Sequence, residues 1–178
     1  DEFVESFCEV VNKHVLYIIC SGFVAIAHGR SRGTEDIDMI IEKINFEQFK
    51  KLHEDLVDNC FECMQSGNPH DIYYNYLSNG DSVRYTRTGE FLPEMEVKFA
   101  KDELDKEQLK ARIKLPFTQL NVYFSSIEGN IAFKEELLKA DKDLEDARHL
   151  RIIYKGKTDE NKINKIKEKI KRLRLNER

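Results

Sequence analysis

Apolar and polar residues alternate along the chain with two different periods, which predict its first helices and strands. Apolar residues recur every three or four positions over 2–14 and 46–59, as in helices that bury one face. Mainly apolar runs at 15–20 and 36–41 predict buried strands, and a short helix is expected at 22–27 between them. The first part of the chain therefore alternates helices with strands.

The helix expected at 46–59 has a clear start and a clear inner face. Asn45 stands where a capping side chain would accept a hydrogen bond from the first turn. The spacing of the apolar residues predicts that Phe49, Leu52, Leu56 and Val57 face inward.

The pattern is less regular in the middle of the chain. Asn79-Gly80 has the composition of a hairpin turn, which predicts antiparallel strands at 71–77 and 82–88. After Pro93, residues 94–99 alternate as in a strand and place Glu94, Glu96 and Lys98 on one face. A surface turn or short helix is expected at 102–110, a strand region at 117–124, and helices beyond about residue 128.

Two carboxylates in the second predicted strand indicate a metal site. Asp36 and Asp38 are two positions apart, so they share one face of a strand while Ile37 and Met39 point to the opposite face. Carboxylate oxygens on one rigid element suit a hard divalent cation. A Ser21-Gly22 turn follows the first predicted strand, and its backbone N–H groups could hold phosphate.

These residues resemble the signature of the nucleotidyltransferase superfold, the DNA polymerase β-like enzymes. That signature is an apolar residue, Gly, Gly or Ser, an intervening segment, and then Asp, an apolar residue, and Asp or Glu. The run from Gly29 to Asp38 most resembles the AbiEii-type toxin nucleotidyltransferases and their archaeal and bacterial relatives. Ser21 departs from the usual pattern, because it stands where the first glycine of the pair is expected.

A second resemblance lies in the C-terminal part of the chain. Residues 131–138 and 142–150 are similar to the family's helical half, where a Lys, here Lys134, faces an Asp-containing segment of the next helix. The resemblance implies an α+β nucleotidyltransferase fold, with a mixed β-sheet flanked by helices and a C-terminal helical part. Residues 1–127 would form the catalytic core, and 128–178 would form a helical region packed on it.

The resemblance also implies two-metal chemistry with Mg²⁺ or Mn²⁺ and a nucleoside triphosphate as substrate. Asp36 and Asp38 would hold the ions, and Glu96 is the candidate for the third carboxylate, with Glu94 and Asp71 as alternatives. The residues expected to contact the phosphates are Ser21, Gly22, Arg30, Arg32 and Lys134.

Several of these residues also have a purely structural interpretation. Arg30 and Arg32 could form surface ion pairs, and Lys134 could pair with Asp143 or Asp146. Thr34 is expected to fix the turn before Asp36, and His28 is expected to be a packed histidine rather than a base.

The composition limits the location and the partners of the chain. It has 178 residues and a net charge of -4, contains no long apolar run and begins with acidic residues, so a cytoplasmic protein without a membrane segment is expected. The last 22 residues hold nine Lys or Arg against four Asp or Glu. Ile163, Ile166, Ile170 and Leu173 recur there at helical spacing, which favours a packed amphipathic helix over a surface for RNA or for an acidic partner.

The pair Cys60 and Cys63 supplies only half of a tetrahedral zinc site. His53 and His70 could complete such a site. Reduced thiols or a local disulfide are the alternatives.

The sequence favours a transferase that moves a nucleoside monophosphate to a hydroxyl on tRNA, on a protein or on a small molecule. The alternative is a non-catalytic nucleotide-binding or partner-binding module, such as a component with an antitoxin-like partner. An antibiotic-type nucleotidyltransferase would share the chemistry but normally has a larger acceptor-binding half, so the short chain counts against it unless a dimer completes the site. A monomer or a homodimer is expected.

Overall fold

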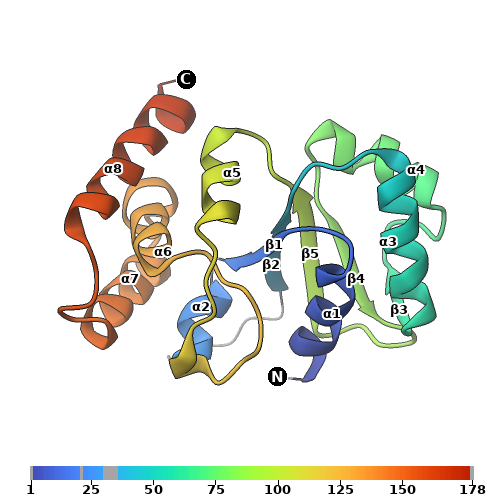
Figure 1. Cartoon of the computed structure of the whole chain (residues 1–178), viewed down its shortest axis with the longest axis horizontal. Coiled ribbons are helices and arrows are strands. Elements are labelled where there is room, and N and C mark those ends of the chain that lie inside the picture. The colour runs from blue at the N-terminus through green and yellow to red at the C-terminus, as the bar shows by residue number, and fades with distance from the viewer. Residues whose placement is uncertain (1, 21, 30–35, 177–178) are drawn as a thin grey trace.

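The computed structural model describes residues 2–20, 22–29 and 36–176 (Figure 1). The strands are β1 Tyr17–Cys20, β2 Asp36–Ile41, β3 Phe61–Cys63, β4 Val83–Arg87 and β5 Glu94–Phe99. The helices are α1 Glu2–Asn12, α2 Gly22–Ala27, α3 Phe46–Asp58, α4 Pro69–Asn75, α5 Glu103–Lys110, α6 Ile127–Phe133, α7 Asp141–Ile153 and α8 Glu160–Ile170. Short 3-10 turns lie at Leu77–Asn79 and Pro116–Thr118, and π-helical turns at Lys134–Leu138 and Lys171–Leu175 continue α6 and α8.

The strands form one mixed five-stranded sheet in the order β1-β2-β5-β4-β3. β2 and β5 run parallel, and the other neighbouring strands run antiparallel. The predicted α+β architecture, a mixed sheet flanked by helices, is therefore confirmed.

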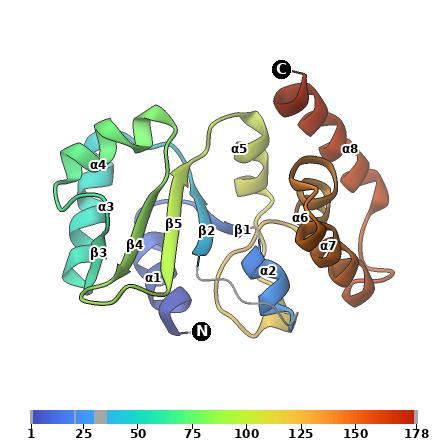
Figure 2. The same ribbon diagram turned by 180° about the vertical axis from the view of Figure 1, so that it is seen from behind.

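Helices cover the two faces of this sheet, and the two faces differ in character (Figures 1 and 2). On one face α1 and α3 close the main hydrophobic core, where the ring centroids of Phe7 and Tyr85 are 5.7 Å apart. On the other face Ile18 and Ile40 form a small cluster with Leu109 of α5. The polar side chains of β2 and β5 therefore lie on the face toward α5 and the C-terminal helices.

The strand predicted at 71–77 is wrong, because this segment is the helix α4 followed by a 3-10 turn. The side chain of Asn68 caps the helix by accepting a hydrogen bond from the backbone N–H of His70, and Pro69 suits the first helical position. Tyr73 then packs against Phe46 and Phe49 of α3. Capping and aromatic packing thus outweigh the β-propensity of the tyrosines.

Two further expectations differ from the structure, and one observed strand was not expected. Residues 117–124 form no strand, although Phe124 makes isolated bridges to Ile19 and Ile113. The three-residue strand β3 is too short to show a period and was not predicted. The side chain of Val57 is exposed, whereas that of His53 is buried on the inner face of α3 and hydrogen-bonds the hydroxyl of Tyr85 at 2.8 Å.

The C-terminal segment is the amphipathic helix that the spacing of its isoleucines predicts. Ile163 and Ile170 are fully buried, and Ile166 and Leu173 pack partly buried against the core. Its basic side chains are not simply solvated: Arg174, for example, binds both Asp102 and Asp105. Among the described residues no helix is long and apolar enough to cross a membrane.

The cysteines of the Cys60 and Cys63 pair carry free thiols, so the predicted alternative of a local disulfide is wrong. Cys60 is exposed, whereas Cys63 is buried in β3.

Candidate functional site

Strand β2 begins with the carboxylate pair that the sequence singled out. Ile37 and Met39 are buried in the main core, so Asp36 and Asp38 point to the opposite face of the sheet. Asp36 is exposed and Asp38 is partly buried. The pleat of the strand therefore places both acids on the face toward α5 and the C-terminal helices.

Parallel pairing with β5 brings two glutamates beside these aspartates. Asp36 lies opposite Glu94, and Asp38 lies opposite Glu96. Paired residues of neighbouring strands share one face of the sheet, and such strands are about 4.8 Å apart. The result is an array of four carboxylates on two adjacent strands.

Glu94 is in close contact with Asp36. A hydrogen bond with Asp36, together with burial, raises the pKa of Glu94 to about 7. Nε of Arg84 lies 3.4 Å from Oε1 of Glu94 and opposes this rise. A raised pKa is the expected effect when a second carboxyl group lies close by.

Glu96 has a different environment. The hydroxyl of Ser82 donates a hydrogen bond of 2.7 Å to Oε1 of Glu96, and Arg84 of β4 is its partner in the strand register. Asp71, the other alternative for the third carboxylate, lies on α4, which packs against α3 on the main-core side of the sheet. The acids near Asp36 and Asp38 on β5 are therefore the two glutamates.

The donor set of this array fits a hard divalent cation, because it consists of carboxylate oxygens on two adjacent strands. Within residues 2–20, 22–29 and 36–176, no three Asp, Glu, His or Cys side chains are grouped so as to hold an ion as they stand.

A cavity of about 280 Å³ opens beside Asp38. Its walls come from the sheet, from α5 and from the segment of α6 and the following π-helical turn, and they include Lys98, Phe133, Lys134 and Leu137. Both charged and apolar groups line it, as in pockets that bind small molecules. The cavity thus joins Asp38 to Lys134, two residues far apart in the sequence.

Lys134 pairs with Asp146, one of the two partners expected from the sequence. Its Nζ lies 3.4 Å from Oδ2 of Asp146, and the two side chains are 1% and 0% exposed. Asp143 instead accepts a hydrogen bond from the backbone N–H of Ala140 at the start of α7. The ion pair joins the π-helical turn to α7 at the wall of the cavity.

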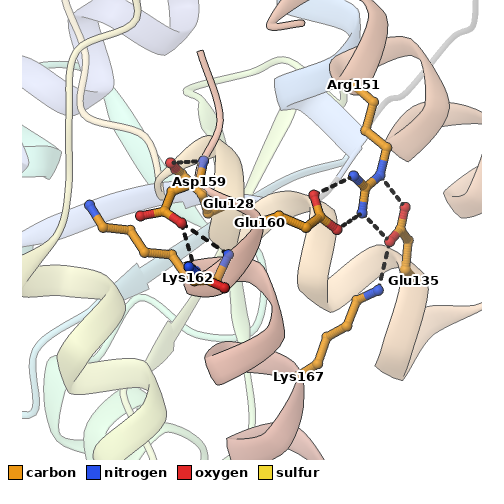
Figure 3. Close-up of polar contacts among 8 residues, drawn as sticks. Glu128, Glu135, Arg151, Asp159, Glu160, Lys162 and Lys167 are labelled. Atoms are coloured by element: carbon orange, nitrogen blue, oxygen red, sulfur yellow. Dashed lines mark hydrogen bonds and ion pairs between the residues drawn. The ribbon is translucent and has the colours of Figure 1, made fainter. Parts of the chain in front are cut away.

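A second ionic network holds the same helices together on the outside (Figure 3). The guanidinium of Arg151 binds Glu135 at 2.8 Å and Glu160 at 2.9 Å, and Lys167 binds Glu135 at 2.8 Å. These contacts connect α7, the π-helical turn and α8. The C-terminal wall of the cavity is therefore fixed from both sides.

His28 is a packed histidine, as the sequence indicated. Its Nδ1 donates to the carbonyl of Val24, so its Nε2 accepts from the hydroxyl of Tyr154, each at 2.6 Å. Tyr154 follows α7, and the bond therefore fastens α2 to the C-terminal helices. The short helix α2 is anchored in this way.

This anchor predicts a pH effect on stability. Burial lowers the pKa of His28 below its usual value near 6.5, so the ring stays neutral in the fold while the unfolded chain takes up a proton. Unfolding free energy should therefore fall as the pH drops from about 7 through 6.5, by up to about 1.4 kcal/mol per pH unit from this group. Urea unfolding at several pH values should show a shallower fall for His28→Gln, and equal slopes for both proteins would contradict the prediction.

Four residues singled out in the sequence, Ser21, Arg30, Arg32 and Thr34, lie outside the described residues. Gly22 begins α2, as predicted. The functional roles of these five residues stay predictions. The same holds for the roles of Asp36, Asp38, Glu96 and Lys134.

Sequence reasoning missed Ser82 and Arg84, which flank the two glutamates. Both were assigned to a predicted strand, and alternation within it would have put them on one face. The missing information was that β4 is the neighbour of β5, since pairing between strands is not visible in a local pattern.

No family model matches this sequence, and no curated protein matches it either. The solved structures that are similar in fold include two of ANT(2'')-Ia. One is a solution structure, described as an antibiotic-resistance factor with substrate-regulated conformation dynamics. Its TM-score is 0.51 and its sequence identity is 12%, and the match covers 94% of this chain and 89% of the ANT(2'')-Ia chain. The other is a crystal structure in complex with adenylyl-2''-tobramycin. Its TM-score is 0.53 and its sequence identity is 15%, and the match covers 94% of this chain and 94% of the ANT(2'')-Ia chain.

These matches overturn the argument from size, because ANT(2'')-Ia is itself matched over 94% of its length. They give no particular support to the AbiEii-type group. The chain has the fold of a nucleotidyltransferase.

Proposed function

We propose that this chain is a nucleotidyltransferase that moves a nucleoside monophosphate from a nucleoside triphosphate to a hydroxyl of a small molecule. The observation that carries this proposal is the pairing of Asp36 and Asp38 with Glu94 and Glu96 on two parallel strands of this fold. In a merely solvated acidic edge Glu94 would be exposed, but it is buried beside Asp36.

In this proposal Asp36, Asp38 and Glu96 hold Mg²⁺ or Mn²⁺. The ions would activate the attacking hydroxyl and stabilise charge on the phosphates. Residues 1–127 form the catalytic core, and residues 128–178 complete the site.

The other residues singled out in the sequence would orient the triphosphate. The backbone N–H groups of Ser21 and Gly22 would bind its phosphates, and Arg30 and Arg32 suit phosphate oxygens because a guanidinium can donate two parallel hydrogen bonds. Lys134 would face the same phosphates from the wall of the cavity.

The cavity favours a small-molecule acceptor over tRNA or a protein. Its volume of about 280 Å³ lies just below the range of roughly 300 to 1,000 Å³ for pockets that bind small ligands. The neighbour in fold was solved with adenylyl-2''-tobramycin, the product of such a transfer to a small molecule. A transferase acting on tRNA or on a protein, with or without an antitoxin-like partner, rests on the sequence resemblance alone.

Incubation of the purified chain with each α-labelled nucleoside triphosphate, Mg²⁺ and a panel of aminoglycosides and amino sugars tests the proposal. Labelled product and released pyrophosphate are expected with at least one small acceptor. Labelling of total RNA or protein in place of the small molecules would contradict the choice of acceptor.

A non-catalytic nucleotide-binding module is the second candidate. It is favoured by the fact that no three metal-binding side chains are pre-assembled within the part of the chain that the structure describes. Calorimetry separates the two: Mg²⁺-dependent binding of a triphosphate without pyrophosphate release would favour the module, and release with an acceptor would favour the enzyme.

A further inference from the structure

The two glutamates of the array are held by side chains of different chemistry. Glu94 is 8% exposed, shares a hydrogen bond with Asp36 and has the guanidinium of Arg84 3.4 Å away. Glu96 is more open and is bound by the neutral hydroxyl of Ser82 at 2.7 Å. One glutamate is thus close to a positive charge, and the other is oriented by a neutral group.

This difference matters for binding a cation. A guanidinium beside a carboxylate competes with a metal ion for the same negative charge. A hydroxyl that donates one hydrogen bond orients the carboxylate and leaves its charge in place, and a carboxylate has about four lone-pair sites for further partners. Glu96 is therefore the better prepared of the two to bind a cation.

The position of Ser82 determines from which side its hydroxyl binds the carboxylate of Glu96. Ser82 directly precedes β4, and its neighbour Val83 pairs with Val97, the residue after Glu96. The carboxylate of Glu96 is thus held from the β4 side, while Asp38 lies on its β2 side. Fixing one oxygen from β4 leaves the other oxygen for a ligand between β5 and β2.

We propose that Ser82 is a positioning residue that aims Glu96 at a divalent cation shared with Asp38, which makes Glu96 rather than Glu94 the third carboxylate. This inference rests on the proposed function, since it assumes that the array binds a cation. Outer hydrogen-bond partners of metal-binding carboxylates typically change metal affinity by about 10 to 100-fold.

Titration of the full chain with Mn²⁺, followed by the paramagnetic resonance signal of the free ion, tests the proposal without reference to turnover. Ser82→Ala should weaken Mn²⁺ binding roughly 10-fold. Ser82→Thr should restore it, because threonine keeps the hydroxyl. Glu96→Gln should weaken binding more than Glu94→Gln. The matched control is Ser66→Ala, which removes a hydroxyl from the loop after β3 that contacts only the backbone N–H of Asn68 among the hydrogen bonds described.

The outcomes separate this inference from the proposed function. Wild-type affinity in Ser82→Ala, or a larger loss in Glu94→Gln than in Glu96→Gln, would overturn the inference while leaving a metal-binding array in place. A loss in Ser82→Ala that Ser82→Thr does not restore would also overturn it, because that pattern reports a packing change. Absence of Mn²⁺ binding by the wild-type chain would overturn both the inference and the proposed metal site.

Discussion

Replacing Asp36 and Asp38 together with asparagine should reduce nucleotidyl transfer about 1000-fold, equivalent to roughly 4 kcal/mol of transition-state stabilisation. Asparagine keeps the size of the side chain and removes the negative charge. The loss is therefore expected in the chemical step and in Mn²⁺ binding rather than in folding. Pyrophosphate release with a small acceptor measures the first effect, and titration with Mn²⁺ measures the second.

The matched control for this double variant is Asp58→Asn, which removes an exposed carboxylate at the end of α3. It should retain wild-type transfer. A double variant that is folded by thermal unfolding and transfers nucleotide at the wild-type rate would show that the aspartates have no part in the chemistry.

Replacing Asp146 with alanine should cost about 3 to 5 kcal/mol of unfolding free energy, because it removes the carboxylate that compensates the buried ammonium of Lys134. For a chain of this size the melting temperature should fall by roughly 10 °C. Thermal and urea unfolding both measure the effect.

Two further variants separate charge from packing in this pair. Glu145→Ala is the matched control, because Glu145 forms only an exposed pair with Arg148 in the ion pairs described, and such pairs contribute about 0 to 1 kcal/mol. The double variant Lys134→Met with Asp146→Leu should recover most of the lost stability, since apolar residues can replace a buried ion pair. A loss in Asp146→Ala no larger than that in Glu145→Ala would contradict the role of the buried pair.

Local signals predicted much of the fold. The strand at 36–41 and the helix at 22–27 have the predicted bounds, because each is marked by a continuous pattern. The segment 71–77 was mispredicted because the cap at Asn68 and the aromatic contacts with α3 act against propensity. Strand β3 depends on its pairing with β4 and has little local signal.

The candidate site was predictable to a similar extent. The spacing of Asp36 and Asp38 predicts that they lie on one face of their strand. The alternation at 94–99 predicts the same for Glu94 and Glu96. The register that brings these pairs together is a property of two strands and could not be obtained from either alone. The contacts of Lys134 with Asp146 and of Ser82 with Glu96 likewise depend on packing between elements.

The most direct test of the central claim is a crystal structure of the chain with Mn²⁺ and a non-hydrolysable nucleoside triphosphate, with the ions located by anomalous scattering. The account predicts Mn²⁺ bound to Asp36, Asp38 and one glutamate of β5, with the phosphates on the same ions. A structure in which Mn²⁺ and the triphosphate bind away from these carboxylates would contradict it.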